Sequence, residues 1–186
     1  MIVGLDLSLT AAGVAVLTES GECFTETFGY QIKKPTAHDQ LLRNISITRN
    51  IIQFLKKYEV RFIAVENYGF AGHTLGKQAE LGGLVKAQVY LNFKRVVVPI
   101  PPTAIRAFLL PKKGKAKEDR QKIVSSKKPV EAHIRSLGYN NPKNDNEFDA
   151  LAVALVMKTY TERDERALNK QQRDLLKRID EQMVKD

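Results

Sequence analysis

The chain contains 186 residues, of which 43% are hydrophobic and 27% are charged, so we expect one folded domain rather than a disordered chain. Its single cysteine, Cys23, and three histidines exclude an intramolecular disulfide and a zinc site built from cysteine and histidine. The formal net charge is +9, and the N-terminal residues show neither a signal peptide nor a membrane-spanning run. We therefore expect a basic cytoplasmic protein in a reducing compartment, with no membrane partner.

Three short strands are predicted at the start of the chain, over residues 1–7, 13–18 and 23–32. The connections between them, "SLTAA" and "ESGE", are short enough for hairpins and indicate an antiparallel meander. Between Asp39 and Lys57 the apolar residues recur at helical spacing, which predicts an amphipathic helix.

Strands and helices alternate in the next part of the chain. A β-branched strand over residues 61–68 contains Glu66 near its end, and a helix over residues 74–93 follows it. Residues 95–100 form a further buried strand, and Pro102 begins a short helix. A meander followed by such alternation predicts an α/β layer fold with a mixed sheet.

The surplus of positive charge is concentrated between Lys112 and Lys128, where eight basic and two acidic residues give +6. This segment is either a solvated loop or an arm that contacts nucleic-acid phosphates. Helices are predicted over residues 129–138 and 145–160, and the second of them is almost entirely apolar after its first turn. Residues 161–186 form a charged helical tail that packs back, extends a dimer or remains free.

Three acids lie within or beside apolar elements: Asp6 in the first strand, Glu66 at the end of a later strand, and Asp149 at the start of the last core helix. Each acid taken alone is more simply a hydrogen-bonded structural residue. Burying carboxylates together is costly unless a cation relieves their repulsion. If the three converge, a pair of divalent cations with oxygen ligands would do this and would create a phosphoryl-transfer site.

The motifs "GLDLSLTAAGVAV", "AVENYGF", "PPTAIR" and "NDNEFDALAVAL" resemble, in order and rough spacing, those of RuvC-type Holliday junction resolvases, which belong to the ribonuclease-H-like nucleases. The resemblance covers about residues 1–158. It implies a five-stranded mixed sheet flanked by helices, with three antiparallel N-terminal strands and two parallel ones. It also implies a homodimer, two Mg²⁺ or Mn²⁺ ions per site, and symmetric nicking of a four-way DNA junction in a bacterial or phage-infected cell.

The resemblance divides the chain into a nuclease domain over residues 1–160, with a basic insertion at about 111–128, and the tail over 161–186. Hydrolysis would use a metal-activated water and no protein nucleophile.

Within this resemblance Asp6 is the bridging metal ligand, Glu66 the second ligand, and Asp149 a ligand on the last helix. The family places an acid three residues before Asp149, where this chain has Asn146. Asp145 lies on the face of Asp149, whereas Glu147 points about 200° away at 100° per residue. We therefore favour Asp145 as the fourth acidic ligand, with Asn146 as a weak carbonyl ligand.

A lysine near the scissile phosphate is also implied. Lys117 lies 32 residues before Asp149, whereas Lys127 and Lys128 lie 22 and 21 residues before it, closer to the family spacing. We favour Lys128 as the catalytic lysine and interpret residues 111–126 as an insertion that touches the DNA backbone.

The residues expected to contact DNA are basic, or are aromatic residues of the loop after Glu66 that would stack on splayed bases. They are Tyr68, Phe70, Arg106, Lys112, Lys113, Lys115, Lys117, Lys127 and Lys128. Each basic residue is otherwise a solvated charge, and each aromatic residue otherwise plugs the loop onto the core.

The helix over residues 74–93 is the expected dimer face, although its apolar side could instead pack on the sheet. That side contains Leu81, Leu84, Val85, Gln88 and Leu91, and Gly82, Gly83 and Ala87 would allow another backbone to approach.

Three other functions share the same acids or the same opening strand. A ribonuclease H, or one of the smaller RNA-processing relatives of the resolvases, would cut RNA, and a non-catalytic module would bind junctions without cutting them. A nucleotide-binding lobe of the actin or sugar-kinase type also opens with a similar strand, but it needs two lobes and a longer chain.

Overall fold

A computed structural model describes residues 1–67, 75–110, 127–162 and 164–183. Its centre is a five-stranded sheet in the order β3-β2-β1-β4-β5. The strands are β1 (Ile2–Asp6), β2 (Ala12–Leu17), β3 (Cys23–Phe28), β4 (Phe62–Glu66) and β5 (Val97–Ile100). The first three strands are antiparallel, while β1–β4 and β4–β5 are parallel, which confirms the predicted mixed sheet and places β1 at its centre.

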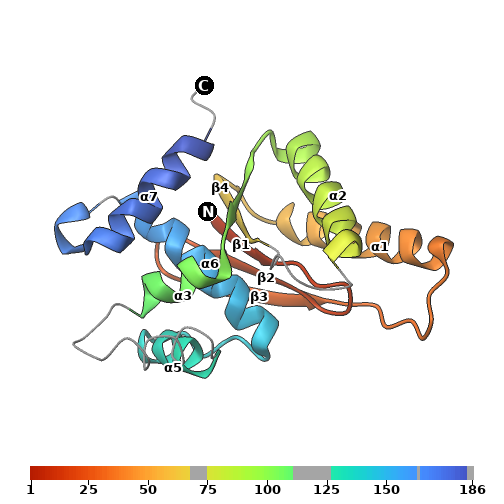
Figure 1. Ribbon diagram of the computed structural model, residues 1–186, viewed down its shortest axis with the longest axis horizontal. Coiled ribbons are helices and arrows are strands. Elements are labelled where there is room, and N and C mark those ends of the chain that lie inside the picture. Colours follow the sequence, from red (N-terminus) through yellow and green to blue (C-terminus); the bar gives the residue numbers. More distant parts are fainter. Residues whose placement is uncertain (68–74, 111–126, 163, 184–186) are drawn as a thin grey trace.

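Helices cover both faces of this sheet (Figure 1). One face is covered by α1 (Ala37–Leu55) and α2 (Leu75–Phe93). The other is covered by α6 (Asp145–Glu162), which is surrounded by α3 (Pro102–Leu109), α5 (Lys128–Ser136) and α7 (Lys170–Gln182). None of the described helices is long and apolar enough to cross a membrane.

Two predicted element boundaries differ from the structure for local reasons. Helix α1 begins at Ala37, ahead of the predicted Asp39, because Thr36 caps it. The Thr36 hydroxyl accepts from the backbone N–H of Asp39 at 3.2 Å, and the Asp39 carboxylate accepts from the Thr36 N–H at 3.0 Å. Strand β3 ends at Phe28, before Gly29, whose backbone passes close to the Thr10 carbonyl.

Side chains of β1 alternate between the two helical layers, as a strand requires. Val3 and Leu5 belong to the aliphatic core beneath α1 and α2. Ile2 belongs to the core beneath α6, and Asp6 shares its side of the strand because it lies four residues later. The strand therefore points its carboxylate toward α6.

The apolar face of α2 differs from the prediction. Leu81, Val85 and Val89 are buried against the sheet and α1, whereas Leu91, which the sequence analysis placed on the same side, is 61% exposed. These three buried residues are spaced four apart, so the side of α2 that faces the sheet and α1 is rotated about the helix axis relative to the predicted apolar side. The alternative in which the apolar side of this helix packs on the sheet is the one that the structure contains.

Two glycines allow α6 to lie directly on the sheet. A β-carbon added at Gly4 of β1 would lie 2.0 Å from the carbonyl oxygen of Ala150, and one added at Gly13 of β2 would lie 2.1 Å from that of Asn146. Such distances are impossible for real side chains, so only glycine permits this contact. The first two turns of α6 thus rest on the backbone of β1 and β2.

The C-terminal tail packs back onto the domain. Leu175, Leu176 and Ile179 of α7 are buried in the core beneath α6. The Tyr160 hydroxyl donates to Asp180 at 2.8 Å, and the Gln172 amide donates to the Phe108 carbonyl at 2.8 Å. Of the three alternatives left open by the sequence, the structure contains the first.

Candidate active site

Asp6 and Glu66 lie side by side at the carboxyl ends of two parallel strands. The register pairs Leu5 with Val65, so the next position along both strands places Asp6 beside Glu66. Ala64, two residues before Glu66, faces the core beneath α6, so Glu66 and Asp6 point to the same face. The end of the parallel strands is where sites form in α/β sheets.

Asp149 approaches these two acids from α6, on which it is buried. Burial raises the pKa of Asp6 to about 7, and the negative charge of Asp149 adds to the effect. Burial likewise raises the pKa of Glu66 to about 8, followed by the charges of Asp6 and Asp149. The three carboxylates are therefore electrostatic neighbours, and nearby positive charge offsets their repulsion only in part.

The acids do not form a closed metal cage as they stand. Among the residues that the structure describes, no group of three acidic, histidine or cysteine side chains lies close enough together to hold a metal ion. Coulombic repulsion acts over a longer range than metal ligation. The acids can therefore raise one another's pKa values although their oxygens are too far apart to hold one ion together.

Lys127 supplies the positive charge next to this cluster. Its ammonium group donates to the Asp149 carboxylate and forms an ion pair with it. Burial lowers the pKa of Lys127, but the hydrogen bond and charge of Asp149, together with Asp6 and Asp145, outweigh burial and raise it. This lysine is partly exposed, so it remains reachable from solvent.

Of the two lysines, the structure places Lys127, and not the favoured Lys128, at Asp149. Which of them assists catalysis stays a prediction. Helix α5 begins between the two, with Lys127 as its N-cap and Lys128 as its first residue. The side chain of Lys127 consequently points to Asp149, whereas Lys128 is exposed on the helix.

The two candidates for the fourth ligand occupy different positions. Asp145 is exposed at the first position of α6, and its charge acts on Lys127. Asn146 is half-buried, and its backbone rests on Gly13, the residue paired with Asp6 across β1 and β2. The choice between the two as the fourth ligand stays a prediction.

The predicted DNA contacts are only partly described by the structure. Arg106 of α3 lies near the acids, since its charge lowers the pKa of Glu66 against the larger effects of burial and the two aspartates. Tyr68, Phe70, Lys112, Lys113, Lys115 and Lys117 lie outside the described residues.

Glu147, which the sequence analysis set aside because it points away from Asp149, accepts several hydrogen bonds near the acids. It is 2% exposed, and its carboxylate accepts hydrogen bonds from Thr25 and Thr27 of β3 at 2.7 and 3.0 Å. It also accepts from the Lys143 backbone N–H at 2.9 Å and from the Asn144 amide at 3.1 Å. Burial would raise the pKa of Glu147, but these hydrogen bonds hold it below its usual value.

One local signal for this network was present in the sequence. Asn144 and Glu147 are spaced as in a capping box at the start of α6, and the Asn144 side chain accepts from the Glu147 N–H at 3.1 Å. The threonine partners lie far away in the sequence, so local spacing does not reveal them.

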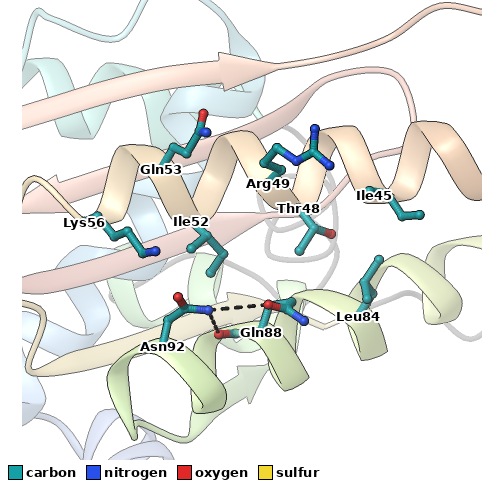
Figure 2. Close-up of a pocket in the computed structure, with 9 residues that line it drawn as sticks. All are labelled: Ile45, Thr48, Arg49, Ile52, Gln53, Lys56, Leu84, Gln88 and Asn92. Carbon is teal, nitrogen blue, oxygen red and sulfur yellow. Dashed lines mark hydrogen bonds between the residues drawn. The ribbon is translucent and has the colours of Figure 1, made fainter.

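A groove of about 470 Å³ lies on the opposite helical layer, between α1 and α2. Figure 2 shows Ile52 and Lys56 of α1 pointing toward α2, from which Leu84 comes, whereas Arg49 lies on the other edge of α1. Leu41 and Leu42 of α1 and Tyr90 and Leu91 of α2 are exposed on the same pair of helices. This layer is separated from the acids by the sheet.

No protein-family model matches the sequence, and none of the curated proteins matches it. Solved structures do match the fold. One is Thermus thermophilus RuvC in complex with a Holliday junction substrate, at 19% identity and a TM-score of 0.65, covering 88% of this chain and 97% of that one. Another structure of RuvC from the same organism matches at 21% identity and a TM-score of 0.60, covering 87% and 96%. The chain therefore has the ribonuclease-H-like fold of RuvC over most of its length.

Proposed function

We propose that this protein is a structure-selective DNA endonuclease that resolves four-way junctions by metal-dependent hydrolysis of phosphodiester bonds. The observation that carries the proposal is the placement of Asp6 beside Glu66 at the end of two parallel strands, with Asp149 approaching from α6. The similarity in fold to a RuvC that is bound to a Holliday junction supports the choice of substrate.

Two Mg²⁺ or Mn²⁺ ions are the cofactors that this donor set fits. Carboxylate oxygens are the ligands these cations prefer. Burial, followed by the charges of the neighbouring acids, raises the pKa values of Asp6 and Glu66, and bound cations would stabilise the ionised carboxylates. Asp6, Glu66 and Asp149 would hold the ions, with Asp145 or Asn146 as the fourth group. When bound, the ions would supply an activated water and stabilise the leaving 3′ oxygen.

Basic residues around the acids would bind and orient the DNA. We assign Lys127 to the scissile phosphate, because it is the lysine whose ammonium group already lies at Asp149 and is partly exposed. Arg106 would contact a neighbouring phosphate from α3. The basic segment before Lys127 would follow the backbone of the DNA, adding affinity without sequence preference.

The protein is proposed to act as a homodimer, because a two-fold symmetric enzyme matches a four-way junction with two symmetric cleavage points. The exposed side of α2 and the adjoining groove would form the contact, since Tyr90 and Leu91 are 55% and 61% exposed there. Leu91→Asp is expected to shift the mass in sedimentation equilibrium from dimer to monomer. Leu137→Asp, at a residue 51% exposed on the other layer, is the matched control and should leave the mass unchanged. A monomeric wild type would contradict the dimer.

Cleavage of a labelled mobile four-way junction tests the activity, beside linear duplex and an RNA/DNA hybrid, with Mg²⁺, Mn²⁺ or EDTA. We expect metal-dependent paired nicks in the junction only, abolished in Asp6→Asn. Lys127→Gln should lower the cleavage rate by about 10² or more, since it removes the cation at the phosphate, while Lys128→Gln should stay within about threefold of the wild type. Tight junction binding without cutting would indicate a binding module, and preferential cutting of the hybrid a ribonuclease.

A further inference from the structure

The polar network around Glu147 ties α6 to β3 at the level of the acids. Asp6 of β1 pairs with Gly13 of β2, and Gly13 pairs with Thr27 of β3, so these three residues form one row across the sheet. The first turn of α6 rests on the middle of this row at Gly13 and is hydrogen-bonded to its end at Thr27. The acid at the beginning of the row is the one that Asp149 approaches.

We propose that Glu147 is a positioning residue for the acid site: by fixing the first turn of α6 to β3, it determines where Asp149 and Asn146 lie relative to Asp6. The inference rests on the proposed metal-dependent function, because it treats Asp149, Asn146 and Asp6 as metal ligands. Glu147 itself contacts neither metal nor DNA in this assignment, because its two carboxylate oxygens are occupied by donors from β3 and from the residues before α6.

The network requires a carboxylate at position 147. One oxygen accepts from the Thr25 hydroxyl and the Lys143 N–H, and the other accepts from the Thr27 hydroxyl and the Asn144 amide. In Glu147→Gln an NH₂ group would replace one of these oxygens. A threonine hydroxyl can turn to accept from it, but the Lys143 N–H and the Asn144 NH₂ cannot. In either orientation of the glutamine side chain, its NH₂ group therefore faces the Lys143 N–H or the Asn144 NH₂, and neither donor of that pair has an acceptor there.

The effect of Glu147 is positional rather than electrostatic. The acids whose charges raise the pKa of Asp6 and Glu66 are Asp149 and, for Glu66, Asp6. Four donors compensate the charge of Glu147 where it lies. Removing a donor on β3 should therefore act like removing the carboxylate, even though the charge of the acid site is unchanged.

The consequence can be measured by calorimetric titration of the metal-free protein with Mn²⁺. Outer groups that orient metal ligands typically change metal affinity by about 10- to 100-fold. We expect Glu147→Gln to weaken Mn²⁺ binding about tenfold or more and Thr27→Val to weaken it in the same direction. Thr27→Ser, which keeps the hydroxyl, should retain the affinity of the wild type.

A control on the same helix separates positioning from general loss of stability. Tyr160→Phe removes the hydrogen bond to Asp180 near the other end of α6, and should leave Mn²⁺ affinity unchanged. Hydrogen exchange of the Phe148 amide, which donates to the Asn144 carbonyl in the first turn, reports on the attachment without any metal. It should accelerate about tenfold in Glu147→Gln and Thr27→Val, and stay unchanged in Tyr160→Phe.

Unchanged Mn²⁺ affinity in both Glu147→Gln and Thr27→Val would overturn the proposal, as would an equal loss in Tyr160→Phe. If the wild type fails to bind Mn²⁺, the proposed metal function fails, and the exchange of Phe148 alone decides whether Glu147 fixes the turn. If Glu147→Gln does not fold, the Mn²⁺ affinities of Thr27→Val and Thr27→Ser test the proposal. Equal affinities in these two variants would overturn it.

Discussion

Glycine and threonine occur both on the face of the sheet beneath α6 and in the layer formed by α1 and α2, but their contacts differ between the two regions. An added β-carbon at Gly4 would collide with the Ala150 carbonyl, whereas one added at Gly83 of α2 would meet no described residue within 4 Å beyond its own chain neighbours and the backbone of its own helix. Thr27 donates to Glu147, whereas the buried Thr48 hydroxyl of α1 has no hydrogen-bond partner among the described residues. One side is specified by backbone contacts and polar pairs, and the other by aliphatic burial.

The largest expected difference between the two sides comes from exchanging glycine for alanine. Gly4→Ala forces α6 away from β1 and should lower the free energy of unfolding by about 3 kcal/mol or more. Gly83→Ala, in open space on an exposed helix, should raise it by about 0.5–1 kcal/mol through helix propensity. Urea denaturation of both variants measures this, and equal effects would show that the close contact of α6 is not what Gly4 provides.

The acids beneath α6 should make stability depend on pH. Because the pKa of Asp6 is raised to about 7, the folded state binds this proton more tightly than the unfolded state does. The free energy of unfolding therefore decreases as pH rises from about 4 to 7, and Glu66 extends the decrease to about pH 8. In EDTA at pH 8, Asp6→Asn should be more stable than the wild type by about 2 kcal/mol.

A carboxylate of the other layer provides the control for this prediction. The hydrogen bonds from Thr36 lower the pKa of Asp39 at the start of α1, so its contribution is present above about pH 4 and lost as pH falls. Asp39→Asn should accordingly lower stability at pH 8. A wild-type stability that rises between pH 5 and pH 8 would contradict the raised pKa values of Asp6 and Glu66.

The smallest expected effects come from exchanging threonine for valine. Thr27→Val removes a donor to the buried Glu147 carboxylate and should destabilise the fold by about 1–2 kcal/mol. Thr48→Val removes a buried hydroxyl without a partner among the described residues and should be neutral or stabilise by up to about 1 kcal/mol. Thermal unfolding of the two variants measures the change in stability. If the two sides differ as described, Thr27→Val destabilises the protein and Thr48→Val does not, whereas destabilisation by both would contradict the difference.

Much of the fold was predictable because it follows from short-range patterns. The alternation of β1, with Val3 and Leu5 on one side and Asp6 on the other, can be read directly, and the order of elements leads to β1 at the centre of a mixed sheet. The face of α2 was not predictable in the same way, because both sides of that helix contain apolar residues. The grouping of Leu91 with Leu81 and Val85 on one side of the helix was wrong for this reason.

The site residues likewise fall into those that local sequence patterns reveal and those that they do not. Asp6 and Glu66 follow apolar strands and could be selected from the sequence, whereas Lys127 and Lys128 differ by one position in spacing. Only the start of α5 between them decides which one reaches Asp149. Gly4 and Gly13 gave no signal because their role depends on a helix that comes more than a hundred residues later. The hydrogen bonds of Glu147 gave no signal either, because its threonine partners on β3 are equally distant.

The late position of α6 and α7 also has a consequence for synthesis of the chain. The side of β1 that faces α6 belongs to the earliest residues, yet its covering helix begins at Asp145, and the core there is completed only by Leu175 and Ile179 of α7. At roughly 5–20 residues per second, this side stays uncovered for on the order of ten seconds while the chain leaves the ribosome. During that interval β1 and β2 can pair as a hairpin, and the carboxylate of Asp6 remains hydrated. Desolvation of the acids therefore has to wait until α6 has been synthesised.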